Sequence, residues 1–488
     1  MRRLIFILFI LFGAFSSKAQ ICTGSLGDPT VVINFGAGAS IGPSLASINT
    51  SYPYNAGDCP NDGYYVITNK TSNCFSNTWH SLAVDHTTGD ANGYMMLVNA
   101  KNDPGIFYTF SVDNLCPNTT YEFSSFIINM IKPSAPCGTI TKPKITFRVE
   151  KEDGTLISTY STGFINETNT PEWKEYGFSF KSPPTVTKVI LKLINDSGGG
   201  CGNDLALDDI TFRPCGPTIF TENTLGNNLQ ICEGSTNNFK FKANVSSGYT
   251  VPAYQWQVDI NDGLGWVDIP NKNSADLDIF IDKAKLAGYT YRLAAAEKEN
   301  ITSASCRAFS NPITILVNPK VNLDPLKDIY VSENTPTKIN ASASGASNLT
   351  YKWSPATYLD DATILQPTAT AKFNTTYKLV VTNPLTGCSA EDQLTIYVDP
   401  NIIIPNSFTP NGDGVNDLWE INGVMGNADV DISVFNRFGQ IVFKSRGFQK
   451  GWDGKLKNIP LPPGVYYYII DTHTPQIPIY KGSLLMIR

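Results

Sequence analysis

Charged residues, histidines and long apolar runs are scarce in this chain. Lys, Arg, Asp and Glu make up 16% of its 488 residues, and 43 acidic against 37 basic side chains leave a formal net charge of −6. No basic block stands out, which argues against a nucleic-acid partner, because phosphate binding needs clustered Lys and Arg. After the N-terminus, no stretch approaches the roughly 20 apolar residues of a membrane-spanning helix. We therefore expect no transmembrane segment in the mature chain.

Patterns typical of zinc sites are also missing. The three histidines are scattered, and the ten cysteines form no Cys-x-x-Cys pair. In an exported chain most cysteines are expected to be bridged, because disulfides persist in oxidising compartments. Cys232 lies just before the first strand and Cys306 just before the last strand of one predicted module, so we predict a Cys232–Cys306 bridge. Cys388 has no second cysteine in its module and is predicted to be free.

The N-terminus has the features of a secretory signal peptide. Arg2 and Arg3 precede an apolar run over residues 4–15, and the small residues Ser17 and Ala19 follow. A charged start, a short apolar run and small residues before the cut are the features that the export machinery recognises. We expect residues 1–19 to be removed by cleavage after Ala19.

Glycine, proline and aromatic residues are plentiful, with 38 Gly, 31 Pro and 11% aromatics. This composition favours short strands joined by tight turns, and hence an all-β fold. At roughly 100–150 residues per domain, the mature chain predicts three or four domains. We predict a multidomain chain of antiparallel β-sandwiches: a jelly-roll head at 21–217, modules at 218–318 and 319–398, and a small sandwich at 401–488.

The two middle modules repeat the same landmarks in the same order. Each has a Tyr-x-Trp triplet, a Tyr-x-Leu triplet, a cysteine and an alternating final strand closed by Asn-Pro or Asp-Pro. The triplets of the first module are Tyr254-Gln-Trp256 and Tyr291-Arg-Leu293. Those of the second module are Tyr351-Lys-Trp353 and Tyr377-Lys-Leu379. Alternation buries one face of a strand, and proline cannot continue the ladder. Each copy thus predicts a self-contained sandwich around a buried tryptophan. The modules resemble immunoglobulin-like and PKD-like repeats of bacterial surface proteins, which implies a spacer role and sometimes a part in adhesion.

The head closes on Gly202-Asn-Asp-Leu-Ala-Leu-Asp208-Asp209-Ile210. This phrase resembles the last strand of galactose-binding-like and carbohydrate-binding jelly rolls. The resemblance implies that an aspartate of this strand, Asp208 or Asp209, ligates a structural calcium. The opening Phe-Glu pair of that family is Phe35-Gly36 here, so one expected ligand is lacking.

A polar loop, Asp85-His86-Thr-Thr-Gly-Asp90-Ala-Asn92-Gly93-Tyr94, is a further candidate site. Its oxygens suit calcium, with Asp90 and Asn92 as ligands, because hard cations take several oxygen ligands. Alternatively, Trp79, His86 and Tyr94 form a sugar-contacting rim. A solvated turn between two strands is the third interpretation.

The sequence Gly38-Ala-Ser40-Ile-Gly42 matches the G-x-S-x-G pattern of serine hydrolases. That pattern needs a strand that turns sharply into a helix, whereas Pro43 and an all-β context follow here. The predicted modules also leave no room for a catalytic domain of ordinary size. We expect no enzyme, and a hydrolase in the head is the least favoured alternative.

The C-terminal segment carries an ordered set of motifs: Phe408-Thr-Pro-Asn-Gly-Asp-Gly-Val-Asn416-Asp417, a hairpin Val430–Phe435 and Ile441–Phe443, Gly451-Trp-Asp-Gly454, Pro462-Pro-Gly-Val-Tyr466, and the ending Lys481-Gly-Ser-Leu-Leu-Met-Ile-Arg488. Over residues 401–488 these phrases resemble the gliding-motility-associated C-terminal domain, the type B sorting domain of the type IX secretion system in gliding Gram-negative bacteria. The resemblance implies transport across the outer membrane by that machinery, removal of the domain, and release or surface attachment.

The first of these motifs also half-matches a calcium loop, with Asn411, Asp413, Asp417 and Glu420 as candidate ligands. Its glycines suit a tight turn equally well. Calcium is thus the one cofactor that the sequence suggests, in the head and in this loop.

Together, these patterns predict a secreted or cell-surface, non-catalytic binding protein or adhesin. Its head would contact a glycan or another surface polymer. The alternative is a carbohydrate-binding accessory protein of a polysaccharide-degrading system.

Overall fold

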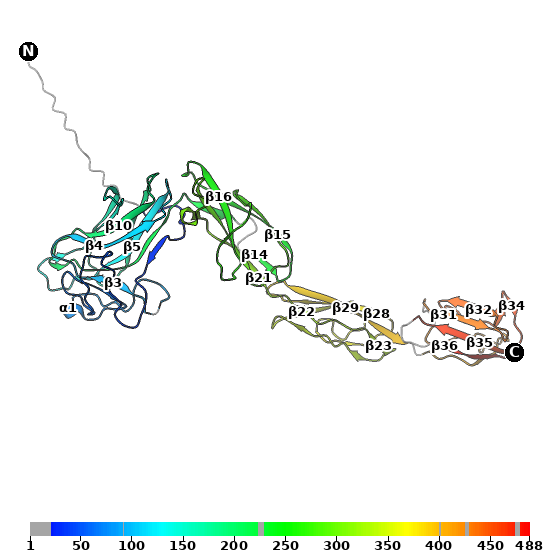
Figure 1. Ribbon diagram of the computed structural model, residues 1–488. Helices are drawn as coiled ribbons and strands as arrows, with labels where there is room; N and C mark the ends of the chain where they lie inside the picture. Colours follow the sequence, from blue (N-terminus) through cyan, green and yellow to red (C-terminus); the bar gives the residue numbers. More distant parts are fainter. Residues whose placement is uncertain (1–20, 91, 223–228, 400–401, 425–428, 474–478) are drawn as a thin grey trace, which may run out of the picture. The chain divides into compact units, whose positions relative to one another are not determined.

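The structure is a computed structural model that describes residues 21–90, 92–222, 229–399, 402–424, 429–473 and 479–488. The predicted signal peptide lies outside these residues. Figure 1 shows that the chain is built almost entirely of strands, and most neighbouring strands pair antiparallel, so the predicted all-β fold is confirmed. Contacts divide the chain into two compact units. One holds the chain up to Leu229, Thr236–Ile281 and Ala287–Leu316, and the other holds Gln230–Ser235, Asp282–Leu286 and Val317–Arg488.

The head (residues 21–217) contains two facing sheets. The first has the order β2-β3-β12-β5-β9, with β1 beside β12: β1 Val31–Ile33, β2 Tyr65–Thr68, β3 Met95–Val98, β5 Thr120–Asn129, β9 Lys174–Lys181 and β12 Leu205–Pro214. The second has the order β4-β10-β7-β8: β4 Gly105–Asp113, β7 Lys144–Glu150, β8 Leu156–Phe164 and β10 Lys188–Asn195. Alternating apolar residues such as Phe123, Phe147 and Leu191 fill the core between them.

A second core lies on the opposite face of the first sheet. Met95, Leu97 and Ile128 alternate with the residues of the main core and pack with Trp79 and Met130. This face is covered by long loops, by α1 (Cys74–Asn77) and by the short strands β6 (Ile140–Thr141) and β11 (Cys201–Gly202). Both faces of the sheet are therefore buried, which explains the continuous apolar runs of β2 and β3.

The first module (residues 218–318) buries Trp256, as the sequence predicts. One sheet has the order β13-β15-β18, and β21, β19, β16 and β17 follow one another in the facing sheet, with β20 beside β19. The strands are β13 Ile219–Glu222, β14 Leu229–Cys232, β15 Asn237–Val245, β16 Pro252–Asp259, β17 Val267–Asp268, β18 Asp276–Ile281, β19 Tyr289–Glu297, β20 Ala308–Phe309 and β21 Ile313–Asn318, and η1 is Ala304–Cys306.

The second module (residues 319–398) likewise buries its tryptophan, Trp353. Its main sheet has the order β23-β29-β28-β26, and β22 pairs with β25 and β24 with β27. The strands are β22 Asn322–Leu323, β23 Ile329–Ser332, β24 Thr337–Lys338, β25 Ala343–Ser344, β26 Thr350–Ser354, β27 Thr368–Ala369, β28 Thr375–Thr382 and β29 Ser389–Asp399.

The C-terminal domain forms one five-stranded sheet with the order β30-β36-β35-β31-β32, and the predicted hairpin is β31–β32. Trp419 and Trp452, which pair through an isolated bridge, close its core. The final strand β36 lies between β35 and the parallel strand β30 and buries Leu484 and Met486. The strands are β30 Ser407–Phe408, β31 Asp431–Phe435, β32 Ile441–Arg446, β33 Lys455–Leu456, β34 Ile459–Pro460, β35 Gly464–Asp471 and β36 Tyr480–Met486.

All ten cysteines are paired, and the predicted pairing was wrong. The bridges are Cys22–Cys215, Cys59–Cys74, Cys116–Cys306, Cys137–Cys201 and Cys232–Cys388. There is no Cys232–Cys306 bond, and Cys388 is not free. The error came from assuming that each bridge closes within one module. Instead, Cys306 is the last residue of η1 and bonds to Cys116 in the β4–β5 connection of the head. Cys232 packs against the core that contains Cys388.

Candidate functional site

Strand β12 brings together the acidic residues that the sequence singles out. A β-bulge follows Asp208, and Asp209 adopts a left-handed backbone conformation with φ 45°. Because a bulge breaks the strict alternation of a strand, both carboxylates reach the loop at residues 85–87. There Asp208 Oδ2 accepts hydrogen bonds from the backbone N–H groups of His86 and Thr87, at 3.0 and 3.3 Å.

Three aspartates form a buried cradle, which we define as Asp85, Asp90 and Asp208. Four of their carboxylate oxygens are buried without a donor from another residue: both of Asp85, Oδ1 of Asp90 and Oδ1 of Asp208. Asp85 and Asp208 lie close enough for a hydrogen bond between their side chains when one of them is protonated. Gly93 lies against the cradle, where a Cβ atom would stand 2.1 Å from Asp85 Oδ2 and 2.4 Å from Asp90 Oδ1. Only glycine leaves room for these two carboxylates.

Burial dominates the electrostatics of this cradle. Burial, with a smaller effect from the neighbouring charges of Asp209 and Asp85, raises the pKa of Asp208 to about 8. It also raises the pKa of Asp85, to which the charge of Asp90 adds. Buried carboxylates of like charge are costly unless a proton or a cation neutralises them.

The cradle fits a hard cation by its chemistry. Calcium takes six to eight oxygen ligands, commonly from Asp, and the four buried oxygens offer a partial set. Within the described residues, no three His, Cys, Asp or Glu side chains already surround a common point closely enough to hold a metal ion. The fit therefore rests on the buried oxygens and on the space left by Gly93. Asp85 was not among the residues predicted as ligands, although it opens the predicted loop.

Asp209 and His86 form a separate pair. His86 Nδ1 lies 2.7 Å from Asp209 Oδ2, and the Thr87 hydroxyl donates to Asp209 Oδ1 at 2.7 Å. Both oxygens of Asp209 are thus engaged, which leaves Asp208 as the strand residue with an open oxygen. The His86 ring stacks on Phe126 at 3.6 Å between centroids, so one face of this ring is covered.

The other two residues of the predicted sugar rim are buried in different clusters. Trp79 belongs to the core beneath the loops, and Tyr94 belongs to the core between the two sheets. These two cores lie on opposite faces of the first sheet, so the two rings are separated by that sheet. The structure therefore does not bring Trp79 and Tyr94 together at one surface.

An open cleft of about 190 Å³ lies beside Trp79 instead. Its walls come from α1, β11 and the segments that follow β3 and precede β12, and they include Asp62, Phe75, Asn102 and Asp204. Asp204 is 5% exposed, and its Oδ1 accepts a hydrogen bond of 3.2 Å from the backbone N–H of Ala100. Burial raises the pKa of Asp204 to about 8, so this carboxyl is mostly protonated at neutral pH.

Phe75 lines this cleft, and its backbone conformation is unusual. Phe75, Ser76 and Asn77 all have positive φ, at 50°, 56° and 66°, so α1 is a left-handed turn. Non-glycine residues pay roughly 1–2 kcal/mol each for this conformation, and the Cys59–Cys74 bridge holds the adjacent chain in place. The turn leaves Phe75 43% exposed, with its ring 4.7 Å from that of Trp79. Neither Phe75 nor Asp204 was predicted, although Asp204 lies within the closing phrase of the head.

The polar side chains of the candidate calcium loop in the C-terminal domain form hydrogen bonds within the loop itself. Asp417 accepts hydrogen bonds from the backbone N–H groups of Gly412 and Gly414, which lower its pKa. Asn411 Nδ2 donates to Asp413 Oδ2 at 2.8 Å, and Asp413 Oδ1 accepts from the backbone of Val415. Glu420 is exposed next to the Trp419–Trp452 bridge. These contacts match the tight-turn interpretation of the loop.

The serine of the G-x-S-x-G match lies in an irregular segment. Residues 38–42 belong to no strand or helix, and Ser40 is exposed. The strand-turn-helix geometry that would activate such a serine is absent from this described segment.

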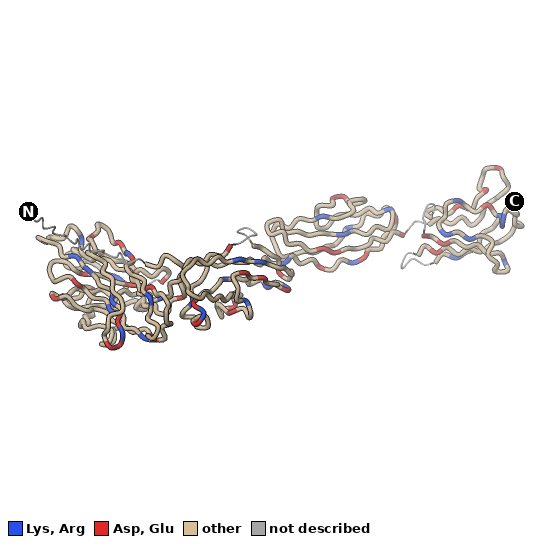
Figure 2. The backbone as a smooth tube through the Cα atoms, turned by 90° about the horizontal axis from the view of Figure 1, so that it is seen from above, with Lys and Arg blue, Asp and Glu red and all other residues tan. Residues whose placement is uncertain are grey.

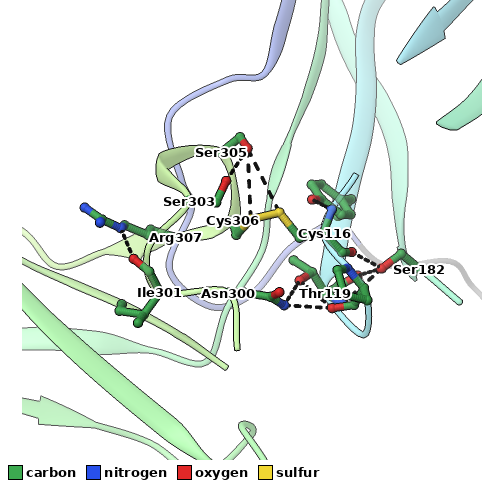
Figure 3. Close-up of a disulfide and its surroundings, with 11 residues drawn as sticks. Cys116, Thr119, Ser182, Asn300, Ile301, Ser303, Ser305, Cys306 and Arg307 are labelled. Carbon is green, nitrogen blue, oxygen red and sulfur yellow. Dashed lines mark hydrogen bonds between the residues drawn. A yellow bond between two sulfur atoms is a disulfide. The ribbon is translucent and has the colours of Figure 1, made fainter. Parts of the chain in front are cut away.

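A second cleft, of about 220 Å³, lies where the head meets the first module. Two of its polar side chains are engaged with the protein itself: the Tyr249 hydroxyl donates to the carbonyl of Ala295, and Glu297 accepts from the backbone N–H groups of Thr250 and Val251. Figure 3 shows the adjoining Cys116–Cys306 bridge, beside which Asn300 Nδ2 donates to the carbonyl of Pro117 at 2.7 Å. This region is a joint, and the cleft beside Trp79 is the better candidate for a ligand.

The distribution of charge does not indicate which cleft binds a ligand. Figure 2 shows acidic and basic residues interspersed along the described chain.

None of the helices in the described part of the chain has the length and apolar character that a membrane span requires.

Solved structures similar to this chain are distant from it. The EclA C-terminal domain, a sugar-binding protein, is 20% identical, with 26% of this chain and 83% of that chain covered and a TM-score of 0.20. Three N-terminal domains of the bacteriophage RB49 highly immunogenic outer capsid protein (Hoc) are 14% identical, with 55% and 97% covered and a TM-score of 0.20. The N-terminal four Ig domains of Dscam1 isoform 4.4 are 12% identical, with 78% and 99% covered and a TM-score of 0.20. Likenesses this distant carry no functional argument.

Curated protein sequences provide no significant match to the chain. Residues 402–486, by contrast, match the CHU_C Type IX secretion signal domain. The match spans the five-stranded C-terminal sheet, including almost all of the ordered motifs at the end of the sequence. The chain therefore carries a type IX secretion signal at residues 402–486, and this signal implies export to the cell surface or the medium.

Proposed function

We propose that this chain is an exported, non-catalytic binding protein whose head binds a glycan or another hydroxyl-rich surface polymer. The observation that carries the proposal is the cleft beside Trp79. It combines an exposed aromatic ring, Phe75, with the polar side chains of Asp62 and Asn102. A sugar ring presents the same two surfaces, an apolar face of C–H groups and an edge of hydroxyls.

The size of the cleft limits the size of the ligand that it can hold. Its volume of about 190 Å³ is below the roughly 300–1,000 Å³ of sites that enclose a drug-sized molecule. One ring or a chain end fits such a cleft better than a long polymer segment does. The amide of Asn102 and the carboxylate of Asp62 would accept hydrogen bonds from the ring hydroxyls, and Phe75 would cover its apolar face.

We further propose that calcium stabilises the head at the Asp85–Asp90–Asp208 cradle. When bound, the ion would neutralise carboxylates whose charge the buried site otherwise disfavours. Asp85 and Asp90 come from one loop and Asp208 from β12, so the ion would fasten this loop to the sheet. The proposed role is structural, because the cradle offers only buried oxygens.

The test is binding of the full mature chain to a glycan array, followed by titration calorimetry with the best ligand. Phe75→Ala should weaken binding about five- to tenfold, because aromatic contacts of this kind contribute about 1 kcal/mol or more. Phe164→Ala is the matched control, since Phe164 is 67% exposed at the end of β8. The sugar should be recovered unchanged after prolonged incubation. Absence of any glycan binding, equal affinity of Phe75→Ala and the native chain, or release of cleaved sugar would contradict the proposal.

A further inference from the structure

Three of the five disulfides join parts of the chain that the sequence places in different modules or at opposite ends of one. Cys22–Cys215 ties the start of the mature chain to the end of the head. Cys116–Cys306 ties the head to the end of the first module, and Cys232–Cys388 ties the start of the first module to the end of the second. The other two bridges close loops within the head.

Non-covalent contacts hold the joint between the head and the first module around these bridges. Arg292 of β19 forms a bidentate ion pair with Asp28 of the N-terminal segment, at 3.1 and 2.7 Å. Its guanidinium also stacks between the rings of Trp266 and Phe309. A buried Asn300 side chain donates to the hydroxyl of Thr119 at 3.0 Å, as Figure 3 shows, and to the carbonyl of Pro117 at 2.7 Å. The N-terminal segment is thus built into this joint.

The bridges shorten the covalent path along the chain. From Cys22 to Cys388 the backbone runs over 366 residues. Through the bridges the path goes from Cys22 to Cys215, along 17 residues to Cys232, and across to Cys388. At about 3.5 Å per extended residue, and with the two bridges included, the two paths measure about 1,300 Å and about 70 Å. A pull between these ends therefore loads β13 and β14 of the first module directly, but it cannot draw out the head or the rest of either module.

We infer that Cys22–Cys215 and Cys232–Cys388 make the exported chain a tension-bearing tether, which can lengthen between Cys22 and Cys388 only as far as the short segment 215–232 allows. Modules held only by non-covalent contacts unfold under force at a rate set by their unfolding barrier, and each one then adds its full chain length. Here the load passes through sulfur–sulfur bonds and the short segment 215–232. Such a tether limits how far the head of a surface-attached chain can move from the cell when flow pulls on it.

Single-molecule stretching of the full mature chain, held at its two ends, tests the inference. The oxidised native chain should reach a final length about 1,200 Å shorter than the same chain after reduction. Removal of the last bridge, in Cys232→Ser/Cys388→Ser, leaves 173 residues between Cys215 and Cys388. This variant should gain about 550 Å over the native chain.

The matched control is Cys59→Ser/Cys74→Ser, because this bridge lies inside the shielded region. It should leave the final length unchanged. A native oxidised chain that extends as far as the reduced one, or a Cys232→Ser/Cys388→Ser chain no longer than native, would overturn the inference. If the variant does not fold, peptide mapping of the non-reduced native chain gives the answer: recovery of the Cys22–Cys215 and Cys232–Cys388 pairs supports the tether, and any other pairing refutes it.

Discussion

Asp204 should make the folded protein less stable as the pH rises. Its pKa is about 8 in the folded chain against an ordinary value of 3.8, with burial as the main cause. Between these two values the folded state keeps a proton that the unfolded state has released. Each step up in pH across this window therefore favours unfolding. At 1.36 kcal/mol per unit, the full window corresponds to roughly 6 kcal/mol as an upper bound.

The interval from pH 6.5 to 8 avoids the opposing effect of His80, and comparison with a variant separates Asp204 from Asp208, whose pKa is also about 8. His80 acts in the opposite direction at lower pH, because burial lowers its pKa below 6.5 and the unfolded state there binds the extra proton. From pH 6.5 to 8, Asp204 alone should cost the native chain about 1.5 kcal/mol. Asp204→Asn keeps the carbonyl oxygen that accepts from Ala100 but cannot ionise, so the variant should lose this part of the slope.

Urea unfolding at pH 6.5, 7, 7.5 and 8 measures the difference, with Asp153→Asn as the control. Asp153 is exposed, and hydrogen bonds with Thr155 lower its pKa, so its substitution should not alter the slope in this interval. Equal slopes for the native chain and Asp204→Asn would refute the assignment of a buried, protonated carboxyl beside the cleft.

Three further predictions concern the cradle, the joint and the last strand. A calcium chelator should lower the melting temperature of the native chain but not of Asp208→Asn, since an ion at 1,000 times its Kd adds about 4 kcal/mol; equal shifts would exclude the cradle. Cys116→Ser/Cys306→Ser should lower the unfolding free energy by up to about 5 kcal/mol, because it opens a long loop; an unchanged urea midpoint would contradict this. Deletion from Lys481 onward removes β36 with its buried Leu484 and should abolish secretion, as fractionation would show; normal secretion would disprove that role.

Local patterns were enough to predict much of the fold. Alternating strands, the two buried tryptophans and the β31–β32 hairpin depend on residues close in sequence, whose side-chain period fixes which face is buried. The C-terminal domain was the clearest case, because an ordered set of motifs covers nearly its whole length. The all-β class followed from the same short-range signals.

Pairings between distant segments could not be predicted in the same way. Cys116 and Cys306 are 190 residues apart, and only the packing of the head on the first module brings them together. The cradle has the same origin, since Asp85 lies in a loop and meets Asp208 at a bulge of β12 that no local pattern reveals. Phe75 is exposed because of a left-handed turn, which its sequence does not favour.

The sorting role of the C-terminal domain is tested most directly by the location of a chain that ends at Asp399. Every strand of the head and of both modules is retained in this chain, and so are all ten cysteines, so it should fold and reach the periplasm. As a positive control, residues 401–488 fused behind a signal peptide and a fluorescent reporter should carry the reporter outside. Cell fractionation should then find the truncated chain in the periplasm and none on the surface or in the medium. Normal appearance of the truncated chain outside the cell would contradict the account.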